Sequence, residues 1–257
     1  MSVNGESGVR SVNRALSILQ VLARTGPAGV SRIAEELGIH KSTVFRLLAT
    51  LEARGMVEQN ASRGEYQLGD GVVQLAAGVT QRHDISVLSR TVCQQLAADA
   101  GETVNIAILD GDELLTLDQV LGASAITTVN WTGQRQVLHA TAGGKVFLAA
   151  MSDADLDEHL RRPLTSFTEH TIVDPALLRA EIARVRETGW ATTGDELEIG
   201  LAALAAPIRS LRGDVEAVVA ISGPSFRVNR QTAPELAESV LSAAAAISAR
   251  NGYPLPG

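Results

Sequence analysis

Cysteine is almost absent from this chain of 257 residues, and long apolar runs are missing. Cys93 is the single cysteine, which excludes a disulfide within the chain and a zinc site built from thiolates. No apolar run approaches the ~18 residues needed to cross a bilayer, and residues 1–10 contain no apolar segment typical of a signal peptide. We therefore expect a cytoplasmic protein that does not insert into a membrane.

Residue patterns that mark common enzymes are missing as well. The five histidines are scattered without metal-ligand spacing, and neither a G-x-S-x-G nor a G-x-G-x-x-G motif is present. Two suggestive sets remain: His139 with Thr141, and the acids Asp195, Glu196 and Glu198. A threonine nucleophile needs a base that the sequence does not identify, and an exposed acidic loop is the commoner explanation of the three acids. We expect no enzymatic activity, no metal and no cofactor.

Charge is distributed unevenly along the chain. The net charge is −7, and hydrophobic residues make up 45% of the composition, which is typical of a globular protein. Residues 1–68 contain eight Arg or Lys and six Asp or Glu, a net charge of +2, whereas the remainder has a net charge of −9. DNA would be attracted weakly to the first region and repelled by the second.

The stretch Ser31 to Arg54, SRIAEELGIHKSTVFRLLATLEAR, reads as two short helices joined by a turn at Gly38, with Ser31 as the expected N-cap. In the second helix one face is apolar at i, i+3, i+4, i+7 spacing: Val44, Leu47, Leu48 and Leu51. Roughly the opposite face has short hydroxyls and a guanidinium: Ser42, Thr43, Arg46 and Thr50. These groups hydrogen-bond to phosphates and base edges, so the stretch predicts a helix-turn-helix.

A β-hairpin is expected directly after the second helix. Met56 to Gln59 and Glu65 to Leu68 read as strands around a turn from Asn60 to Gly64. A hairpin in this position is the wing of a winged helix, and Arg63 at its tip would meet a phosphate backbone or a minor groove. The alternatives are an ordinary helical hairpin with a solvated face and an interaction module that has lost DNA binding; the second would require the loss of the hydroxyl and Arg46 face.

Two further helices frame this region. Residues 9–23 have helical periodicity and would pack on the stripe of the second helix through Val12, Ala15, Leu16, Leu19, Leu22 and Ala23. Apolar residues also recur at helical spacing between Val72 and Val79, and such a helix between two domains often forms a dimer contact. From Ile85 helices and strands alternate: strands are expected at Thr103–Leu109, Leu114–Val120, Ala125–Asn130, Ala203–Ile208 and Val215–Ile221, with a turn at Ser222–Pro224.

The segment His139 to Lys145, HATAGGK, reads as a loop of small residues that opens a helix. Glycines allow a ligand to approach the unpaired first amides of a helix, so a carboxylate or phosphate site is one interpretation and tight packing on a sheet is the other. The segment is not a Walker A motif. Lys145 would neutralise an anion or lie in solvent.

Several ordered motifs resemble the IclR-type transcriptional regulators over nearly the whole chain. They are SVNRALSILQVLA, ELGIHKSTVFRLLATLEARGMVE, YQLGD, HATAGGKVFLA, GWATTGDELEIG and LAAPI with ISGP. The resemblance implies an α+β protein with a winged helix-turn-helix domain (9–69), a linker helix that dimerises (70–84) and a GAF-like effector-binding domain with a mainly antiparallel sheet (85–251).

The same resemblance implies the partners and the sites. The partners are a double-stranded DNA operator, a small-molecule effector and further copies of the chain in a dimer or tetramer. The expected DNA contacts are Lys41, Ser42, Thr43, Arg46, Thr50, Arg63 and Tyr66, with Arg46 as the main base reader. The expected effector contacts are Thr128, Trp131, Ala142, Gly143, Thr193, Ala203 and Ser222.

Two positions make the pocket of this chain distinctive. Many family members have an Asp and a Cys where we align Thr193 and Ala203. The loss of a carboxylate and a thiol makes the pocket less polar, while Ser222 retains a hydrogen-bonding group and Trp131 supplies an aromatic wall. We therefore predict an aromatic or alkyl carboxylate larger or more apolar than a two- or three-carbon keto acid, and repression as the mode of regulation.

Overall fold

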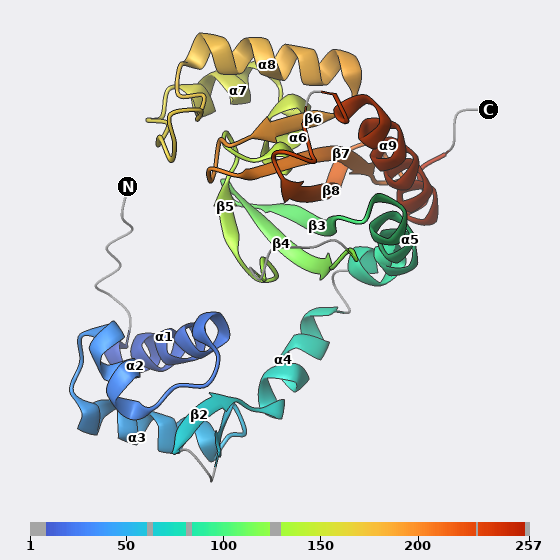
Figure 1. Cartoon of the computed structure of the whole chain (residues 1–257). Helices are drawn as coiled ribbons and strands as arrows, with labels where there is room; N and C mark the ends of the chain where they lie inside the picture. Colours follow the sequence, from blue (N-terminus) through green and yellow to red (C-terminus); the bar gives the residue numbers. More distant parts are fainter. Residues whose placement is uncertain (1–8, 61–63, 81–83, 124–129, 230, 255–257) are drawn as a thin grey trace. The chain divides into compact units, whose positions relative to one another are not determined.

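The computed structural model describes residues 9–60, 64–80, 84–123, 130–229 and 231–254 (Figure 1). The chain divides into two compact units, Met1–His83 and Asp84–Gly257, and each has its own hydrophobic core. The predicted α+β fold is confirmed: a helix-turn-helix with a two-stranded wing precedes a larger unit with a six-stranded antiparallel sheet. The strand expected at Ala125–Asn130 lies almost wholly outside the described residues.

The first unit is a three-helix core followed by a hairpin and a helix. Its elements are α1 (Arg10–Thr25), α2 (Val30–Leu37), α3 (Lys41–Glu52), β1 (Val57–Asn60), β2 (Glu65–Leu68) and α4 (Asp70–Thr80). Gly38 ends α2 in the left-handed conformation, with φ of 62°, as the helix-turn-helix pattern requires. Ile18, Ile33, Val44 and Leu48 are fully buried and hold the three helices together.

Two expectations for this unit are wrong in detail. The N-cap of α2 is Gly29, so Ser31 is an exposed residue of the first turn and not the cap. Helix α1 buries Ile18, Val21 and Leu22, whereas Val12 and Leu16 are each 53% exposed. The apolar residues of α1 cover more of its circumference than the three-helix core occupies, and periodicity alone did not show which of them would be buried.

Three glycines join the wing to α4. The amide of Gly71 donates to the carbonyl of Gly55 at 2.8 Å, and the amide of Gly69 donates to the carbonyl of Met56 at 3.0 Å. A Cβ atom on Gly69 or Gly71 would lie 2.5 or 2.7 Å from the oxygen of Gly55, closer than real Cβ contacts allow. Glycine is therefore required for the start of α4 to lie against the turn that follows α3.

The second unit is built on a sheet of order β5-β4-β3-β8-β7-β6 in which every neighbouring pair is antiparallel. Its strands are β3 (Thr103–Asp110), β4 (Glu113–Val120), β5 (Arg135–Val137), β6 (Ala191–Gly194), β7 (Leu201–Arg209) and β8 (Val215–Pro224). Its helices are α5 (Asp84–Ala100), α6 (Ala142–Ala150), α7 (Asp153–Leu160), α8 (Pro175–Thr188) and α9 (Ala233–Arg250). β8 continues through Ser222, so the turn expected at 222–224 is wrong, and β5 was not predicted.

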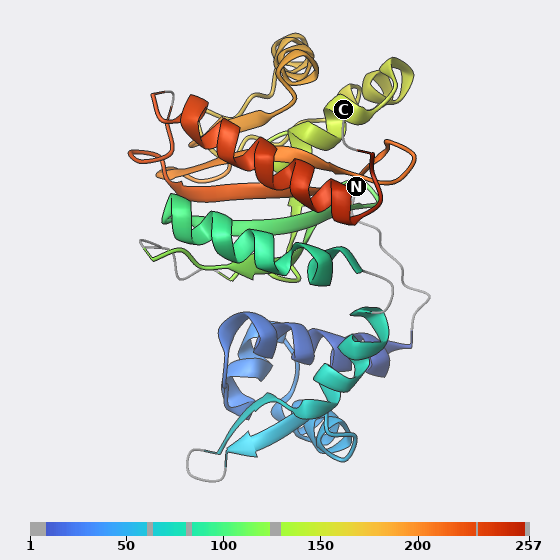
Figure 2. The same ribbon diagram turned by 90° about the vertical axis from the view of Figure 1, so that its right-hand side faces the viewer.

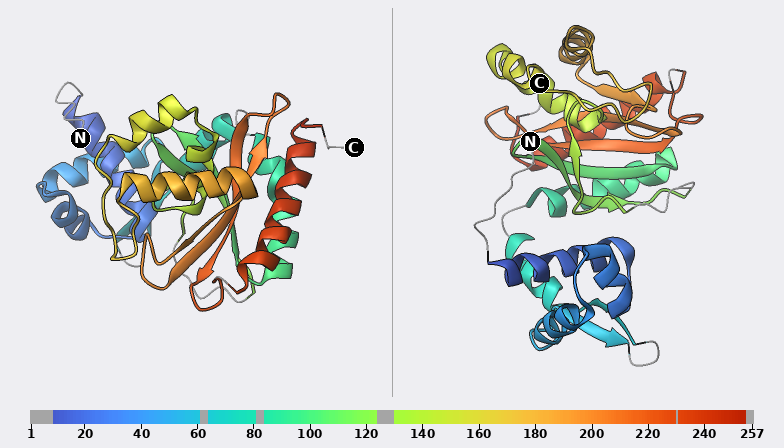
Figure 3. Two further views of the ribbon diagram at one scale, coloured as in Figure 1. Left: turned by 90° about the horizontal axis from the view of Figure 1, so that it is seen from above. Right: turned by 90° about the vertical axis from the view of Figure 1, so that its left-hand side faces the viewer.

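Helices cover both faces of this sheet. Figure 2 shows α5 and α9 side by side on one face, and the view from above in Figure 3 shows α7 and α8 on the other side. Alternate strand residues separate the two layers: Ile106, Leu204 and Ile221 belong to the α5/α9 core, whereas Ala107, Ala205 and Val218 belong to the core around α6 and α8. This alternation follows from the period of two in a strand. It also places Ser222 on the same face of β8 as Val218, toward α6.

Candidate nucleic-acid interface and ligand pocket

Helix α3 presents a polar face to solvent. Lys41, Ser42, Arg46 and Thr50 are exposed and Thr43 is half-buried, whereas Val44 and Leu48 are fully buried on the opposite side. Arg46 forms no ion pair with any residue in the described ranges, so its guanidinium is available to an external anion. The helix therefore presents hydrogen-bond donors on one exposed face and is held to the core by the other, an arrangement suited to major-groove recognition.

The structure adds three residues to this surface that sequence reasoning missed. Thr43, Arg46 and Thr50 line a groove of about 700 Å³ whose other wall is α1, where Arg10 and Arg14 are exposed. Two more guanidinium groups therefore lie on the side of α3 that carries the hydroxyls. Phe45 is 58% exposed on the other flank of α3, a position where an apolar residue has no packing role. It was passed over because the apolar stripe did not include it.

Of the remaining expected DNA contacts, one is not described by the structure and one is buried. Arg63 lies outside the described residues. Tyr66 is only 4% exposed and packs in the core of the first unit, where its backbone pairs with Ala28. Tyr66 is therefore a packing residue of the wing and not a surface contact; the alternation of β2 directs it inward.

Six of the seven expected effector contacts line one cavity in the second unit. They are Trp131, Ala142, Gly143, Thr193, Ala203 and Ser222, and Thr128 lies outside the described residues. The cavity has a volume of about 60 Å³. Register explains part of the grouping, because Thr193 is paired with Ala203 and Ala203 with Ser222, so the three side chains form one row across β6, β7 and β8.

The N-terminus of α6 closes one side of this cavity. Thr141 is the N-cap: its hydroxyl accepts from the amide of Gly144 at 3.2 Å and donates to the carbonyl of Val137 at 2.8 Å. The amides of Ala142 and Gly143 form no hydrogen bond within the described structure, and both residues line the cavity. A Cβ atom on Gly143 would lie 2.9 Å from Cγ2 of Val218, so glycine keeps this end of the helix close to the sheet. Two unpaired donors and the positive end of the helix dipole favour an anion here.

The cavity contains polar side chains but no charged one among the described residues that line it. Besides the expected contacts, the polar lining comprises Asn105, Thr116, Gln136 and Thr141, and the apolar lining includes Leu114, Leu197, Leu201 and Val218. Asn105 lies on β3, and its Nδ2 donates to Oγ of Ser222 at 2.8 Å. No sequence motif marks these additional residues as cavity residues. For Asn105 the available signal was a polar residue inside an apolar strand, as in TVNIAIL.

Lys145 occupies neither of the positions expected for it. Its side chain is completely buried, and Nζ donates to Oε1 of Glu196 at 2.7 Å. Glu196 is 7% exposed, which corrects the expectation of an exposed acidic loop at that residue. Burial raises the pKa of Glu196, and the attraction of Lys145 opposes this rise. The pair connects the first turn of α6 to the loop 195–200.

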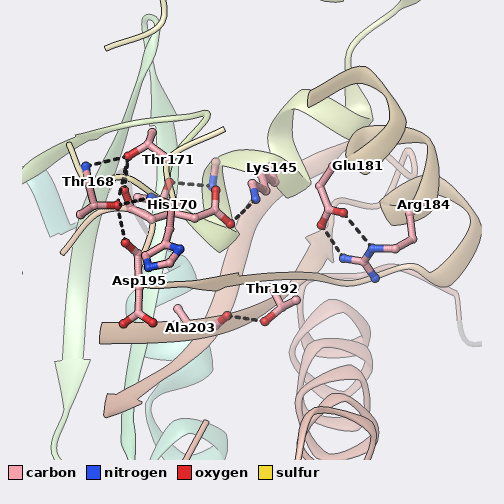
Figure 4. A network of polar contacts seen from close by, with 12 residues as sticks. Lys145, Thr168, His170, Thr171, Glu181, Arg184, Thr192, Asp195 and Ala203 are labelled. Carbon is pink, nitrogen blue, oxygen red and sulfur yellow. Dashed lines mark hydrogen bonds and ion pairs between the residues drawn. The ribbon is translucent and has the colours of Figure 1, made fainter. Parts of the chain in front are cut away.

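Further contacts fasten the loop 195–200 (Figure 4). The hydroxyl of Thr168 donates to the carbonyl of Asp195 at 2.6 Å, and that of Thr171 donates to the carbonyl of Glu196 at 2.6 Å. The loop places Leu197 in the wall of the cavity. The buried ion pair and these two hydroxyls therefore fix the position of one cavity wall relative to the helix that forms another.

The residue sets that suggested catalysis have structural roles. Nε2 of His139 contacts the carbonyl of Thr165 at 2.9 Å, and the hydroxyl of Thr141 is used as the cap of α6. The carboxylate of Asp195 accepts from the amide of Gly200 at 2.6 Å, which closes the loop on itself. Neither set is arranged as a nucleophile with a base.

Other features limit the chemistry of the described residues. Cys93 is buried, and burial raises the pKa of its thiol to about 11, which keeps it protonated at neutral pH. No group of three or more His, Cys, Asp or Glu side chains in the described ranges is placed to hold a metal ion. Within the same ranges, no helix is both long and apolar enough to span a bilayer.

Taken together, a winged helix-turn-helix and a separate unit with a cavity lined by polar and apolar side chains are typical of a one-component regulator that binds DNA. Comparison with known proteins gives the family. Residues 11–61 match the IclR helix-turn-helix domain, and residues 77–249 match the C-terminal domain of the bacterial transcriptional regulator IclR. The chain belongs to the IclR family of transcriptional regulators, whose members are not enzymes.

Individual relatives are similar to this chain over almost its full length. The transcriptional repressor AllR of Escherichia coli strain K12 is 32% identical over 96% of this chain and 92% of its own. The crystal structure of the Thermotoga maritima IclR has a TM-score of 0.81 with 28% identity, covering 95% of this chain and 99% of that one. An IclR homologue from Microbacterium hydrocarbonoxydans, complexed with 4-hydroxybenzoate, shares the fold with a TM-score of 0.79 and 22% identity, over 94% and 98% of the two chains.

Proposed function

We propose that this protein is a repressor that binds a pseudo-palindromic operator as a homodimer or homotetramer and is modulated by a small aromatic or alkyl carboxylate. The observation that carries the proposal is that one chain combines an exposed polar face on α3 with a separate cavity that ends at the unpaired amides of α6. Repressors occur among the relatives, AllR for example. A bacterial regulator that acts on DNA works in the cytoplasm.

In this proposal Lys41, Ser42, Thr43, Arg46 and Thr50 contact the major groove, and Arg10, Arg14 and Arg63 contact phosphates. Residues 9–69 form the DNA-binding domain, residues 70–84 the linker and residues 85–251 the effector domain. A single copy with a net charge of +2 in residues 1–68 binds DNA weakly, so two copies on two half-sites are needed for a stable complex.

Exposed apolar side chains support the self-association. Val73 and Leu75 on α4 are 68% and 63% exposed. Clusters of this kind on a globular unit mark protein contacts. A second copy of the same unit is the occupant we propose for them.

The effector acts by binding better to one arrangement of the two DNA-binding units than to the other. The test is fluorescence anisotropy of the purified protein on its own upstream intergenic DNA and on a shuffled control, at fixed salt, with and without a panel of carboxylates. We expect preferential binding to the upstream DNA, which one class of carboxylate changes. Equal, weak binding to both fragments that no compound alters would contradict the proposal.

A further inference from the structure

One hydrogen-bond acceptor in the cavity has no partner. Oδ1 of Asn105 is buried, and no donor contacts it within the described structure. The amide of the same side chain is already used, since Nδ2 donates to Oγ of Ser222 at 2.8 Å. Buried acceptors in native proteins are almost always satisfied, and an unsatisfied one in a ligand cavity indicates a group that the ligand supplies.

Ser222, the partner of Asn105, places a hydrogen-bond donor beside the free acceptor of Asn105. Because Oγ of Ser222 accepts from Asn105, its own proton is free to be donated, and no acceptor for it is found among the described residues. The two side chains reach this position from adjacent strands, β3 and β8, where Asn105 is opposite Ala220 and Ser222 is two residues further along the same face. The pair therefore offers one acceptor and one donor to the same region of the cavity.

The chemistry of this pair selects among ligand groups. A carboxylate accepts only, so it cannot satisfy Oδ1 of Asn105, and an ammonium donates only, so it cannot take the proton of Ser222. An ammonium would also be buried without a counter-charge, because none of the described lining residues is charged. A hydroxyl both donates and accepts, and it satisfies both atoms.

We propose that the effector is a hydroxylated carboxylic acid whose hydroxyl is bound by Asn105 and Ser222 on the sheet. The inference rests on the proposed function of the cavity as the effector site, with the carboxylate at the amides of Ala142 and Gly143. It makes Asn105 a specificity-determining residue, because a site with a buried polar pair rejects an analogue that lacks the matching group.

The test is isothermal titration calorimetry of the full-length protein with matched pairs of acids. The pairs run from lactate and propionate through 3-hydroxybutyrate and butyrate to 4-hydroxybenzoate and benzoate. We expect at least one hydroxy acid to bind ten-fold or more tightly than its deoxy partner. Asn105→Leu should remove that ratio to within two-fold while it leaves the affinity of the deoxy acid within about three-fold. Ser222→Ala, which removes only a hydroxyl, should reduce the ratio in the same direction.

Thr188→Val is the control, because Thr188 is an exposed threonine at the end of α8 and is not among the residues that line the cavity; it should preserve the ratio. If the deoxy acids bind as tightly as their hydroxy partners, this inference is overturned and the proposed carboxylate effector stands. If no acid of the series binds, the proposed effector class fails, and the inference fails with it. An equal ratio in wild type and in both Asn105→Leu and Ser222→Ala would assign the discrimination to other residues and overturn the role of Asn105.

Discussion

Two helices carry the proposed functions, and they are placed in opposite ways. Helix α3 buries Val44 and Leu48 and exposes its polar side chains. Helix α6 buries every residue from Ala142 to Leu148 and offers a ligand only the backbone amides of its first turn. In the proposed function, α3 recognises DNA through its side chains. Helix α6 binds the ligand through its backbone amides, together with side chains of the surrounding strands. Substitutions should therefore affect recognition at α3 and stability first at α6.

The largest expected effect concerns the ion pair below α6. Lys145→Met leaves Glu196 buried without its partner, which should lower the free energy of unfolding by about 3–5 kcal/mol. Both tryptophans, Trp131 and Trp190, lie in the second unit, so urea unfolding followed by tryptophan fluorescence reports on this unit alone. The double variant Lys145→Met with Glu196→Gln, which removes both charges, should recover part of the loss. A loss below about 1 kcal/mol would contradict this role of the pair.

The loss of stability in the single variant Lys145→Met should depend on pH. Burial raises the pKa of Glu196 above its ordinary value of 4.5, and loss of the opposing Lys145 raises it further. A carboxyl group with a raised pKa in the folded state stabilises the fold below pH 4.5, and that stability is lost as the pH rises through the folded-state pKa. The deficit of Lys145→Met should therefore be smaller at pH 5 than at pH 8. A deficit independent of pH would show that Glu196 is not its source.

The next effect concerns recognition by α3. Arg46→Ala should cost ~1–3 kcal/mol of binding to the operator, with little loss on a shuffled fragment, because Arg46 is the proposed base reader. Arg10→Ala on α1 is the matched control. As a phosphate contact it should weaken binding to both fragments equally and reduce the salt slope by about 1. Unchanged operator affinity in Arg46→Ala would remove this residue from the interface.

The smallest effects compare one threonine in each helix. Thr141→Ala removes the cap of α6 and should lower the free energy of unfolding of the second unit by about 1 kcal/mol, whereas Thr141→Ser should retain most of it. Thr50 is exposed on α3, and its hydroxyl donates only to the carbonyl of Arg46, four residues earlier. Thr50→Ala should therefore change the stability of the first unit by less than about 0.5 kcal/mol. Differential scanning fluorimetry and chemical unfolding of each variant provide the comparison.

The sequence predicts the first unit better than the second because the relevant contacts are local. The periodicity of α3, the glycine at position 38 and the hairpin all lie within about forty residues, and each has a known local preference. Two expectations for this unit failed: Ser31 is not the N-cap of α2, and Tyr66 points into the core and not to the surface. The residue type indicates whether a position favours a helix cap or a surface site. Packing against other elements decides which residues of a short helix or strand are actually buried.

In the second unit the important partners are far apart in the chain. Lys145 meets Glu196 across 51 positions, and Asn105 meets Ser222 across 117. A motif such as HATAGGK indicates a helix start near a ligand, but it does not show that its lysine is buried. Six of the residues that the family resemblance implied line one cavity, whereas Asn105, a single polar residue in an apolar strand, could be placed there only from the register of β3 and β8.

The three glycines at the base of the wing have a mechanical consequence. Because Gly69 and Gly71 lie directly against Gly55, the turn after α3 and the start of α4 leave no room for a hinge between them. The start of α4 is therefore fixed to the turn that follows α3, and we expect a displacement of α4 to reach α3 through this contact. A side chain at either glycine would push the two segments apart, so in the proposed regulator it should weaken the coupling between α4 and α3 while each helix stays folded.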